Sequence, residues 1–156
     1  MRYISDWISS GFGSGYARVI PGTFGSAAAL MFWLLLHRLG LPPEFSPHLI
    51  LIATTITIGT IAVAYSIGTT PSVADPQWIV IDEWAGLFIA LIGLQPSQWT
   101  WVFCAFVLFR VWDACKWGPV GFAERLPGAS GIMADDIVAG IAAAGCVYLL
   151  RSVVGS

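Results

Sequence analysis

The chain has 156 residues, of which 57% are hydrophobic and only 10% are charged, and its formal net charge is −2. Soluble domains carry about 25% charged residues, so this composition, with a mean hydropathy of +0.79, excludes an ordinary water-soluble globule. A net charge so close to zero gives no electrostatic basis for binding nucleic acid. We therefore expect a single membrane-embedded domain over residues 1–156, with the lipid bilayer as its solvent.

The N-terminal part, residues 1–20, is glycine-rich and too polar to cross a membrane, which predicts an interfacial or re-entrant segment. It lacks the continuous apolar region and the small-residue cleavage site of a signal peptide, so we expect it to be retained. Its glycines at 11, 13 and 15 follow no strand and do not satisfy GxGxxG, so they do not predict a nucleotide-binding loop.

Five apolar runs follow, separated by turns that contain proline or glycine. A helix needs about 20 residues to cross a bilayer, and in lipid every backbone group must be hydrogen-bonded internally. The runs therefore predict an all-α integral membrane protein, a bundle of about five transmembrane helices (four to six). The predicted spans are 22–39, 48–69, 78–94, 99–116 and 132–153. The third is the least regular, because Asp82 and Glu83 interrupt its start.

Five of the nine acidic residues are predicted to meet at one face of this bundle, because short turns make consecutive spans antiparallel. They are Asp82, Glu83, Asp113, Asp135 and Asp136. An alternative is that acids at helix starts only complement the helix dipole. Carboxylates are costly in a membrane and usually face a polar cavity or a partner. Since five of them also repel one another, we expect a divalent cation among them. Oxygen ligands without His or Cys favour Mg²⁺, with Mn²⁺ or Ca²⁺ as alternatives, over Zn²⁺.

Groups suited to a phosphate fall at the same face. Lys116 lies three residues after Asp113 and so shares its helix face; the alternative is a plain surface ion pair between them. At the start of the first span, Thr23, Gly25 and Ser26 supply hydroxyls and amides for an oxyanion. Thr23 or Ser26 could equally serve as the helix N-cap.

Two glycines lie one helical turn after a carboxylate, Gly86 after Asp82 and Gly140 after Asp136. A missing side chain at such a position lets either another helix or a lipid headgroup approach. The sequence leaves both interpretations open.

Other polar residues do not suggest a catalytic role. Cys104 and Arg110 have the spacing of cysteine-dependent phosphatases, but the residues between them form an apolar helical run that cannot wrap a phosphate. Arg110 precedes Asp113 by one turn and is expected to pair with a carboxylate or a headgroup. His37 and His48 flank the opposite turn, far from the acids.

Four motifs occur in an order that resembles the phosphatidylglycerophosphatase A family, over residues 10–145. They are Pro21-Gly22-Thr23-Phe24-Gly25-Ser26, Asp82-Glu83-x-x-Gly86, Asp113-x-x-Lys116 and Gly131-Ile132-Met133-Ala134-Asp135-Asp136-x-x-Ala139-Gly140. The family pattern often has Lys-Pro where this chain has Lys116-Trp117, and Gly-Gly where it has residues 127–130. Both departures lie in the loop 117–130 and bear on substrate fit rather than on metal chemistry.

The resemblance implies a Mg²⁺-dependent phosphatase of the bacterial inner membrane that converts phosphatidylglycerophosphate to phosphatidylglycerol. It implies that the five carboxylates hold one or two Mg²⁺, that one carboxylate takes a proton from water, and that a covalent aspartyl-phosphate is the competing route. Lys116, amides near Thr23 and the side chain of Arg125 would steady the phosphate. Two rival functions are a phosphatase of another lipid phosphate and a cation transporter. The oligomeric state is left open.

The distribution of basic residues predicts the orientation of the protein. The predicted site face carries four of them and the opposite face two, so the positive-inside rule places the site in the cytoplasm. The first group is Arg2, Arg18, Lys116 and Arg125; the second is Arg38 and Arg151.

Overall fold

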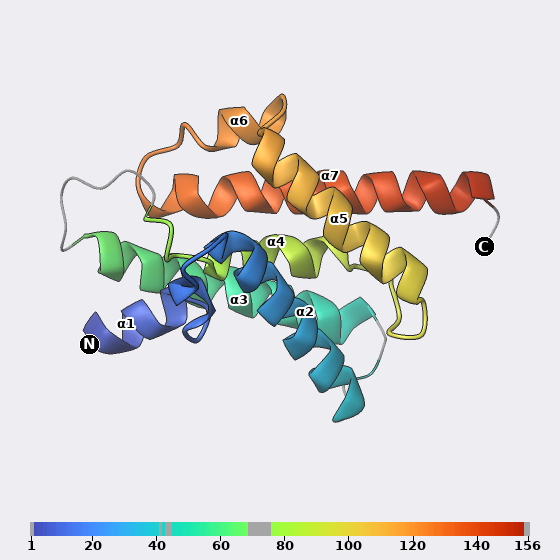
Figure 1. Ribbon diagram of the computed structural model, residues 1–156, viewed down its shortest axis with the longest axis horizontal. Helices are drawn as coiled ribbons and strands as arrows, with labels where there is room; N and C mark the ends of the chain where they lie inside the picture. The colour runs from blue at the N-terminus through green and yellow to red at the C-terminus, as the bar shows by residue number, and fades with distance from the viewer. Residues whose placement is uncertain (1, 41, 43–44, 69–75, 155–156) are drawn as a thin grey trace.

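All regular structure is helical in the computed structural model, which describes residues 2–40, 42, 45–68 and 76–154 (Figure 1). The elements are α1 (Arg2–Ser9), the 3-10 helix η1 (Ser14–Tyr16), α2 (Pro21–Arg38), α3 (Phe45–Ile67), α4 (Ile81–Ala90), α5 (Trp99–Cys115), α6 (Pro119–Ala123) and α7 (Ala129–Val154). No strand occurs within the described ranges, and the prediction of an all-α protein is confirmed.

Two helices are long and apolar enough to cross a membrane: Ser46–Ile67 within α3, and Ala129–Val154, which is α7. With 18 and 17 residues, α2 and α5 are shorter. The prediction of five crossing helices therefore stays a prediction. Residue 69, the last of the predicted span 48–69, lies outside the described ranges. Residues 1 and 156, the ends of the predicted domain, also lie outside them.

The third predicted span is much shorter than the sequence indicates. Instead of a helix over 78–94, the chain forms α4, with ten residues, nine of which are buried. At 1.5 Å per residue α4 is roughly 15 Å long, about half the hydrocarbon thickness of a bilayer. The helix ends where the amide of Ile92 turns back to the carbonyl of Ile89, and Gly93 follows with φ of 72°. Its apolar residues face other helices rather than lipid, so hydropathy alone overestimated its length.

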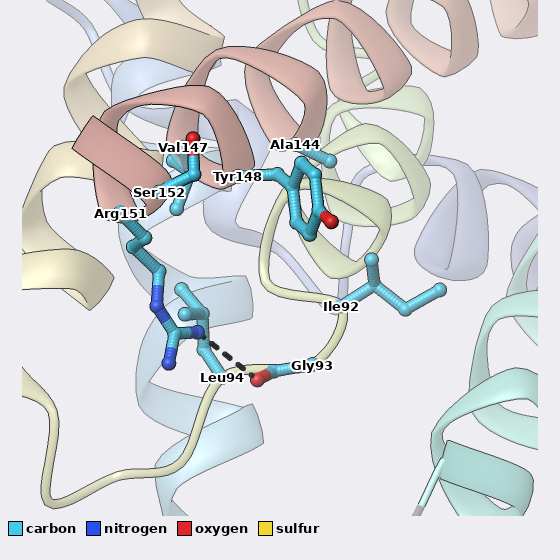
Figure 2. A pocket seen from close by; sticks show the side chains of 8 residues that line it. All are labelled: Ile92, Gly93, Leu94, Ala144, Val147, Tyr148, Arg151 and Ser152. Atoms are coloured by element: carbon cyan, nitrogen blue, oxygen red, sulfur yellow. Dashed lines mark hydrogen bonds between the residues drawn. The ribbon is translucent and has the colours of Figure 1, made fainter. Parts of the chain in front are cut away.

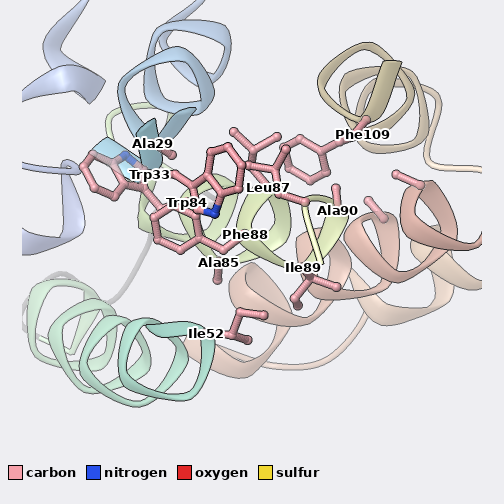
Figure 3. Packing of buried hydrophobic residues seen from close by; sticks show 14 of the residues in the cluster. Ala29, Trp33, Ile52, Trp84, Ala85, Leu87, Phe88, Ile89, Ala90 and Phe109 are labelled. Carbon is pink, nitrogen blue, oxygen red and sulfur yellow. The ribbon is translucent and has the colours of Figure 1, made fainter. Parts of the chain in front are cut away.

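The core of the protein surrounds α4, which lies between α2, α3, α5 and α7 (Figure 3). Trp33 of α2 and Phe109 of α5 are fully buried, and their rings lie beside the side chains of α4. Ile52 of α3 closes the same cluster from another side. Contacts with four neighbouring helices thus fix the position of this short helix.

Helices α4 and α7 approach each other closely at two glycines. A Cβ atom on Gly140 would collide with the backbone of Gly86, and one on Gly86 would lie 2.5 Å from the carbonyl oxygen of Asp136. Small residues allow helix backbones to meet in this way. The space beside these glycines is thus filled by the neighbouring helix, which resolves the open interpretation. The crossing also sets Asp82 and Asp136, each one turn earlier, beside one another.

The N-terminal segment is folded onto the bundle. Helix α1 packs against α3, and the Ser9 hydroxyl lies 3.3 Å from that of Ser66. The carbonyl of Ser9 accepts a hydrogen bond from the amide of Val80, just before α4. These contacts anchor the segment to the residues that precede the acidic pair; its position at a membrane interface stays a prediction.

Candidate active site

The predicted acidic face is a cavity of about 440 Å³, at the end of the bundle where α2, α4 and α7 begin and α5 ends. All five carboxylates predicted from the sequence line it, together with Lys116 and Thr23. The full lining comprises Ile20, Pro21, Gly22, Thr23, Gln77, Ile79, Asp82, Glu83, Arg110, Asp113, Ala114, Lys116, Asp135 and Asp136. The antiparallel order of the helices thus brings together residues more than fifty positions apart in the sequence.

Three of the carboxylates form a tight cluster. Asp82, Glu83 and Asp136 each offer one oxygen, and these oxygens lie within 4.8 Å of one another. Asp82 and Asp136 are 6% and 3% exposed. One oxygen of Glu83 (Oε2) and one of Asp136 (Oδ1) are buried without a hydrogen-bond partner among the described residues. Such oxygens are costly unless a cation offsets their charge. This all-oxygen donor set fits a hard divalent cation.

The other two carboxylates are each bound to a basic side chain. Asp113 Oδ2 lies 2.6 Å from Arg110 Nη1. Asp135 Oδ2 accepts a hydrogen bond from Lys116 Nζ, and its Oδ1 accepts one from the amide of Asp136 at 3.0 Å. Among the described residues, neither Asp113 nor Asp135 belongs to the cluster that could share one ion. The five predicted ligands therefore divide into three clustered carboxylates and two outside the cluster, each in close contact with a basic side chain.

Lys116 does not form the surface pair with Asp113 that the spacing allowed. It is the first residue after α5, with φ of 50°, a left-handed conformation that usually favours glycine. Its ammonium binds Asp135 on α7 and the Oε1 of Glu124, 3.1 Å away, just past α6. These bonds hold the start of α7 against the end of α5 beside the cavity.

The start of α2 contributes less to the cavity than the sequence indicates. Thr23 lines it, but Gly25 and Ser26 do not. A Cβ atom on Gly25 would lie 2.6 Å from the Cβ of Val80, so this glycine permits close packing against the residue before α4. The Ser26 hydroxyl donates to the carbonyl of Gly22 at 2.8 Å. Ile20 is the N-cap residue, so the capping role considered for Thr23 or Ser26 is wrong.

Two arginines lie differently with respect to the cavity than the sequence predicted. Arg125 does not line it; its guanidinium lies 5.1 Å from the ring centroid of Phe122, on an exposed part of the chain. Arg110, expected only to pair with a carboxylate or a headgroup, does line the cavity. Gln77 also lines it, and nothing in the sequence distinguished this residue from other loop residues.

A second cavity of about 440 Å³ lies near the C-terminus of α7 (Figure 2). Its lining comprises Ile92, Gly93, Leu94, Ala144, Val147, Tyr148, Arg151 and Ser152, without a carboxylate side chain. Arg151 donates a hydrogen bond to the carbonyl of Gly93 at 3.5 Å. Its one charged residue is thus directed at the protein's own backbone, and the acidic cavity is the better candidate for catalysis.

Sequence comparison matches residues 7–151 to the family model for phosphatidylglycerophosphatase A, a range that includes every residue of the acidic cavity. The chain belongs to the phosphatidylglycerophosphatase A family. Phosphatidylglycerophosphatase A of Escherichia coli (strain K12) is 37% identical over 144 residues, which cover 92% of this chain and 81% of that protein. The protein of the same name from Haemophilus influenzae is 35% identical, over 92% of this chain and 86% of the relative.

A third relative has a different name. A Bacteroides thetaiotaomicron protein, provisionally named phosphatidylinositol-3-phosphatase, is 34% identical over 95% of this chain and 94% of its own length. No solved structure matches the chain significantly. All three names refer to the removal of phosphate from a phospholipid, so the family resemblance inferred from four motifs is confirmed over nearly the whole chain.

Proposed function

We propose that this protein hydrolyses the terminal phosphate monoester of phosphatidylglycerophosphate, giving phosphatidylglycerol and inorganic phosphate in phospholipid biosynthesis. The observation that carries the proposal is the buried cluster of Asp82, Glu83 and Asp136, which lies in a cavity at one end of an apolar helical bundle. Membership of the phosphatidylglycerophosphatase A family supports the choice of substrate.

We expect Asp82, Glu83 and Asp136 to hold Mg²⁺, because their two unpartnered buried oxygens need a cation and hard oxygen donors favour this one. When bound, such an ion supplies positive charge that neutralises phosphate and makes water a stronger acid. Asp113 and Asp135 surround the cluster and are already ion-paired. Their contribution is to add negative charge close to the cation and to orient Arg110 and Lys116.

The hydrolysis needs a proton acceptor and a phosphate-binding group from the chain. A water molecule attacks phosphorus and gives up a proton to a carboxylate oxygen of the cavity that does not bind the metal. The bond from phosphorus to the glycerol oxygen breaks, and that oxygen takes up a proton. Because the amides of Thr23 and Phe24 donate to the carbonyl of Ile20, the Thr23 hydroxyl is the group at this helix start that we propose for phosphate. An aspartyl-phosphate intermediate is the competing route.

We propose that α2, α3, α5 and α7 cross the membrane and enclose α4, with the acidic cavity facing the cytoplasm. Two of these helices meet the criteria of length and apolarity. The basic residues support the orientation, because they are more numerous at the cavity end. Arg18, Lys116 and Arg125 lie just before α2, after α5 and after α6, whereas Arg38 and Arg151 end α2 and α7 at the opposite side. This arrangement places the cavity at headgroup depth. The position of the carboxylates at helix ends does not favour the rival cation transporter, in which they would lie midway along the helices.

The proposal is tested by measuring phosphate release from the purified protein in detergent, with Mg²⁺ and with EDTA. We expect Mg²⁺-dependent release from phosphatidylglycerophosphate, at a higher kcat/KM than from phosphatidate or phosphatidylinositol 3-phosphate. The second of these competitors is included because of the Bacteroides relative's name. A preference for either competitor would reject the proposed substrate, and equal rates in EDTA would reject the proposed metal.

A further inference from the structure

Arg110 occupies a central place in the cavity, between three helices. It extends from α5 with its Nη1 2.6 Å from Asp113 Oδ2 and 3.9 Å from Glu83 Oε1 on α4. The same nitrogen donates to the hydroxyl of Ser26 on α2 at 3.4 Å. A Cβ atom on Gly22 would clash with Glu83 and would lie 3.0 Å from Arg110 Nη2. The glycine therefore leaves room for the guanidinium beside the first turn of α2.

The guanidinium is only partly used by these contacts. Arginine has five N–H donors in a planar fork, and the contacts of Arg110 with Asp113, Glu83 and Ser26 all involve Nη1. Its Nη2 and Nε donate to no acceptor among the described residues. The side chain is 22% exposed and lines the cavity. Donors are thus left over on a cation that a molecule in the cavity can reach.

The charge of the cavity makes these donors important. Five carboxylates line it, and the basic residues among its described lining are Arg110 and Lys116. A phosphate that enters must be attracted in spite of this negative field. The ammonium of Lys116 is already bonded to Asp135 and Glu124, and it acts as a point charge rather than a fork. Arg110 has the free donors and the geometry that suits two phosphate oxygens.

We propose that Arg110 binds the phosphate group of the substrate, through Nη2 and Nε, while Nη1 remains on Asp113. This assignment rests on the proposed function and names the residue that recognises the phosphate, a role predicted above for Lys116 and Arg125 with amides near Thr23. Arg110 also lies close to the carboxylates expected to hold the cation. Its positive charge opposes cation binding there, so its two effects, on phosphate and on metal, have opposite signs.

The opposite effects of Arg110 on phosphate binding and on metal binding provide the test. Arg110→Gln and Arg110→Lys are compared with wild type and with Arg38→Gln, which removes a charge at the exposed far end of α2. Two quantities are measured: the affinity for Mn²⁺, by electron paramagnetic resonance, and the inhibition constant for inorganic phosphate. A hydrogen bond to a charged group is worth about 1.5–3 kcal/mol. Arg110→Gln is therefore expected to raise the inhibition constant for inorganic phosphate roughly 10- to 100-fold.

The same Gln variant is expected to bind Mn²⁺ as tightly as wild type or more tightly, because a competing positive charge is gone. Arg110→Lys keeps the charge but loses the fork, so its phosphate constant is expected to fall between those of wild type and Gln. Arg38→Gln is expected to change neither quantity. If Arg110 only positions Asp113 and Glu83, Arg110→Gln will instead weaken Mn²⁺ binding and leave the phosphate constant unchanged, which overturns the proposal.

Failure of this inference can be told apart from failure of the proposed function. If the wild-type protein does not hydrolyse phosphatidylglycerophosphate, the proposed function is wrong, but binding of inorganic phosphate to the Mn²⁺-loaded protein can still be measured by calorimetry. Loss of that binding in Arg110→Gln and its partial retention in Arg110→Lys would support the phosphate site. Equal binding by wild type and both variants, or no binding by wild type, would overturn it whichever lipid is the substrate.

Discussion

Two cavities of about 440 Å³ lie at opposite ends of α4, and their linings differ in charge rather than in size. The cavity at the start of α4 gathers five carboxylates, an arginine and a lysine. The one past its end has a single charged residue among its described lining, Arg151 (Figure 2). The guanidinium of Arg151 also lies 6.0 Å from the ring centroid of Trp101. Volume therefore does not distinguish a reactive site from a gap in packing.

The two ends of α4 also differ in how their polar groups are hydrogen-bonded. Near the far end, the carbonyl of Phe88 accepts a hydrogen bond from His48 Nε2 at 2.8 Å. The amides that could pair with it, those of Leu91 and Ile92, bind Leu87 and Ile89 instead. A carbonyl can only accept, so Nε2 must carry the proton. At the acidic end, by contrast, one side-chain oxygen of Glu83 and one of Asp136 have no hydrogen-bond partner in the described part of the chain. The comparison indicates that the far end is built for stability and the acidic end for binding.

The largest expected effect comes from removing one carboxylate charge from the acidic cavity, compared with removing the one charge of the other cavity. Asp136→Asn keeps the shape of the side chain but removes a member of the carboxylate cluster, so kcat/KM should fall by about 10³-fold, as for loss of a group that acts in the transition state. Mn²⁺ binding should weaken in parallel. Arg151→Gln in the other cavity should change kcat/KM by less than about twofold. The measurements are steady-state phosphate release and electron paramagnetic resonance.

A matched control for the loss of negative charge is Asp6→Asn. Asp6 lies outside the cavity and its contact with Arg2, at 3.9 Å, is a surface ion pair of little energetic value. We expect it to behave as wild type. Should Arg151→Gln reduce activity as much as Asp136→Asn does, the assignment of catalysis to the acidic end would be wrong.

A smaller effect, on stability, is expected where α4 and α7 cross between the two ends. Gly140→Ala would place a methyl group against the backbone of Gly86. Overpacking of this kind costs about 1–3 kcal/mol, so the unfolding midpoint in detergent should fall. Gly145→Ala is the control in the same helix, because a Cβ atom there meets nothing within 4 Å. It should be neutral or stabilising by up to about 1 kcal/mol. Equal shifts for both variants would show that the close crossing does not limit stability.

The convergence of the acids was predictable because it depends only on where turns fall and on the alternation of helix direction. Which carboxylates cluster and which pair with a base was not, since it depends on how far each helix is rotated about its axis. Asp113 and Asp135 illustrate this: both reach the cavity, but Asp113 pairs with Arg110 and Asp135 with Lys116.

The length of α4 was unpredictable for a related reason. Hydropathy records that a residue avoids water, but it does not record whether the residue faces lipid or another helix. Leu87 and Phe88 are fully buried inside the bundle, although the sequence predicted a membrane span over 78–94. Gly25 presents a similar ambiguity, because a glycine at a helix start suits a phosphate and a close helix contact equally well. The structure shows the close contact, with Val80.

The smallest effect is expected at the far end of α4, from His48→Leu. This change removes the donor to the carbonyl of Phe88, and loss of a buried hydrogen bond among membrane helices costs about 1 kcal/mol. The unfolding midpoint should fall slightly, while kcat/KM per folded molecule and Mn²⁺ affinity stay at wild-type values. His37→Leu is the control, because His37 Nδ1 contacts a carbonyl in its own helix, that of Trp33, and ties no second helix to it.

The outcome of the His48 comparison decides how independent the two ends of α4 are. A ten-residue helix enclosed by four others could transmit a shift at Phe88 to Asp82, since both lie on the same rigid element. If His48→Leu lowers kcat/KM while the midpoint is unchanged, the far end contributes to catalysis by fixing the position of the acidic end. If only the midpoint falls, the glycine crossing with α7 is sufficient to hold the acidic cluster in register, and the hydrogen bond of His48 serves stability alone.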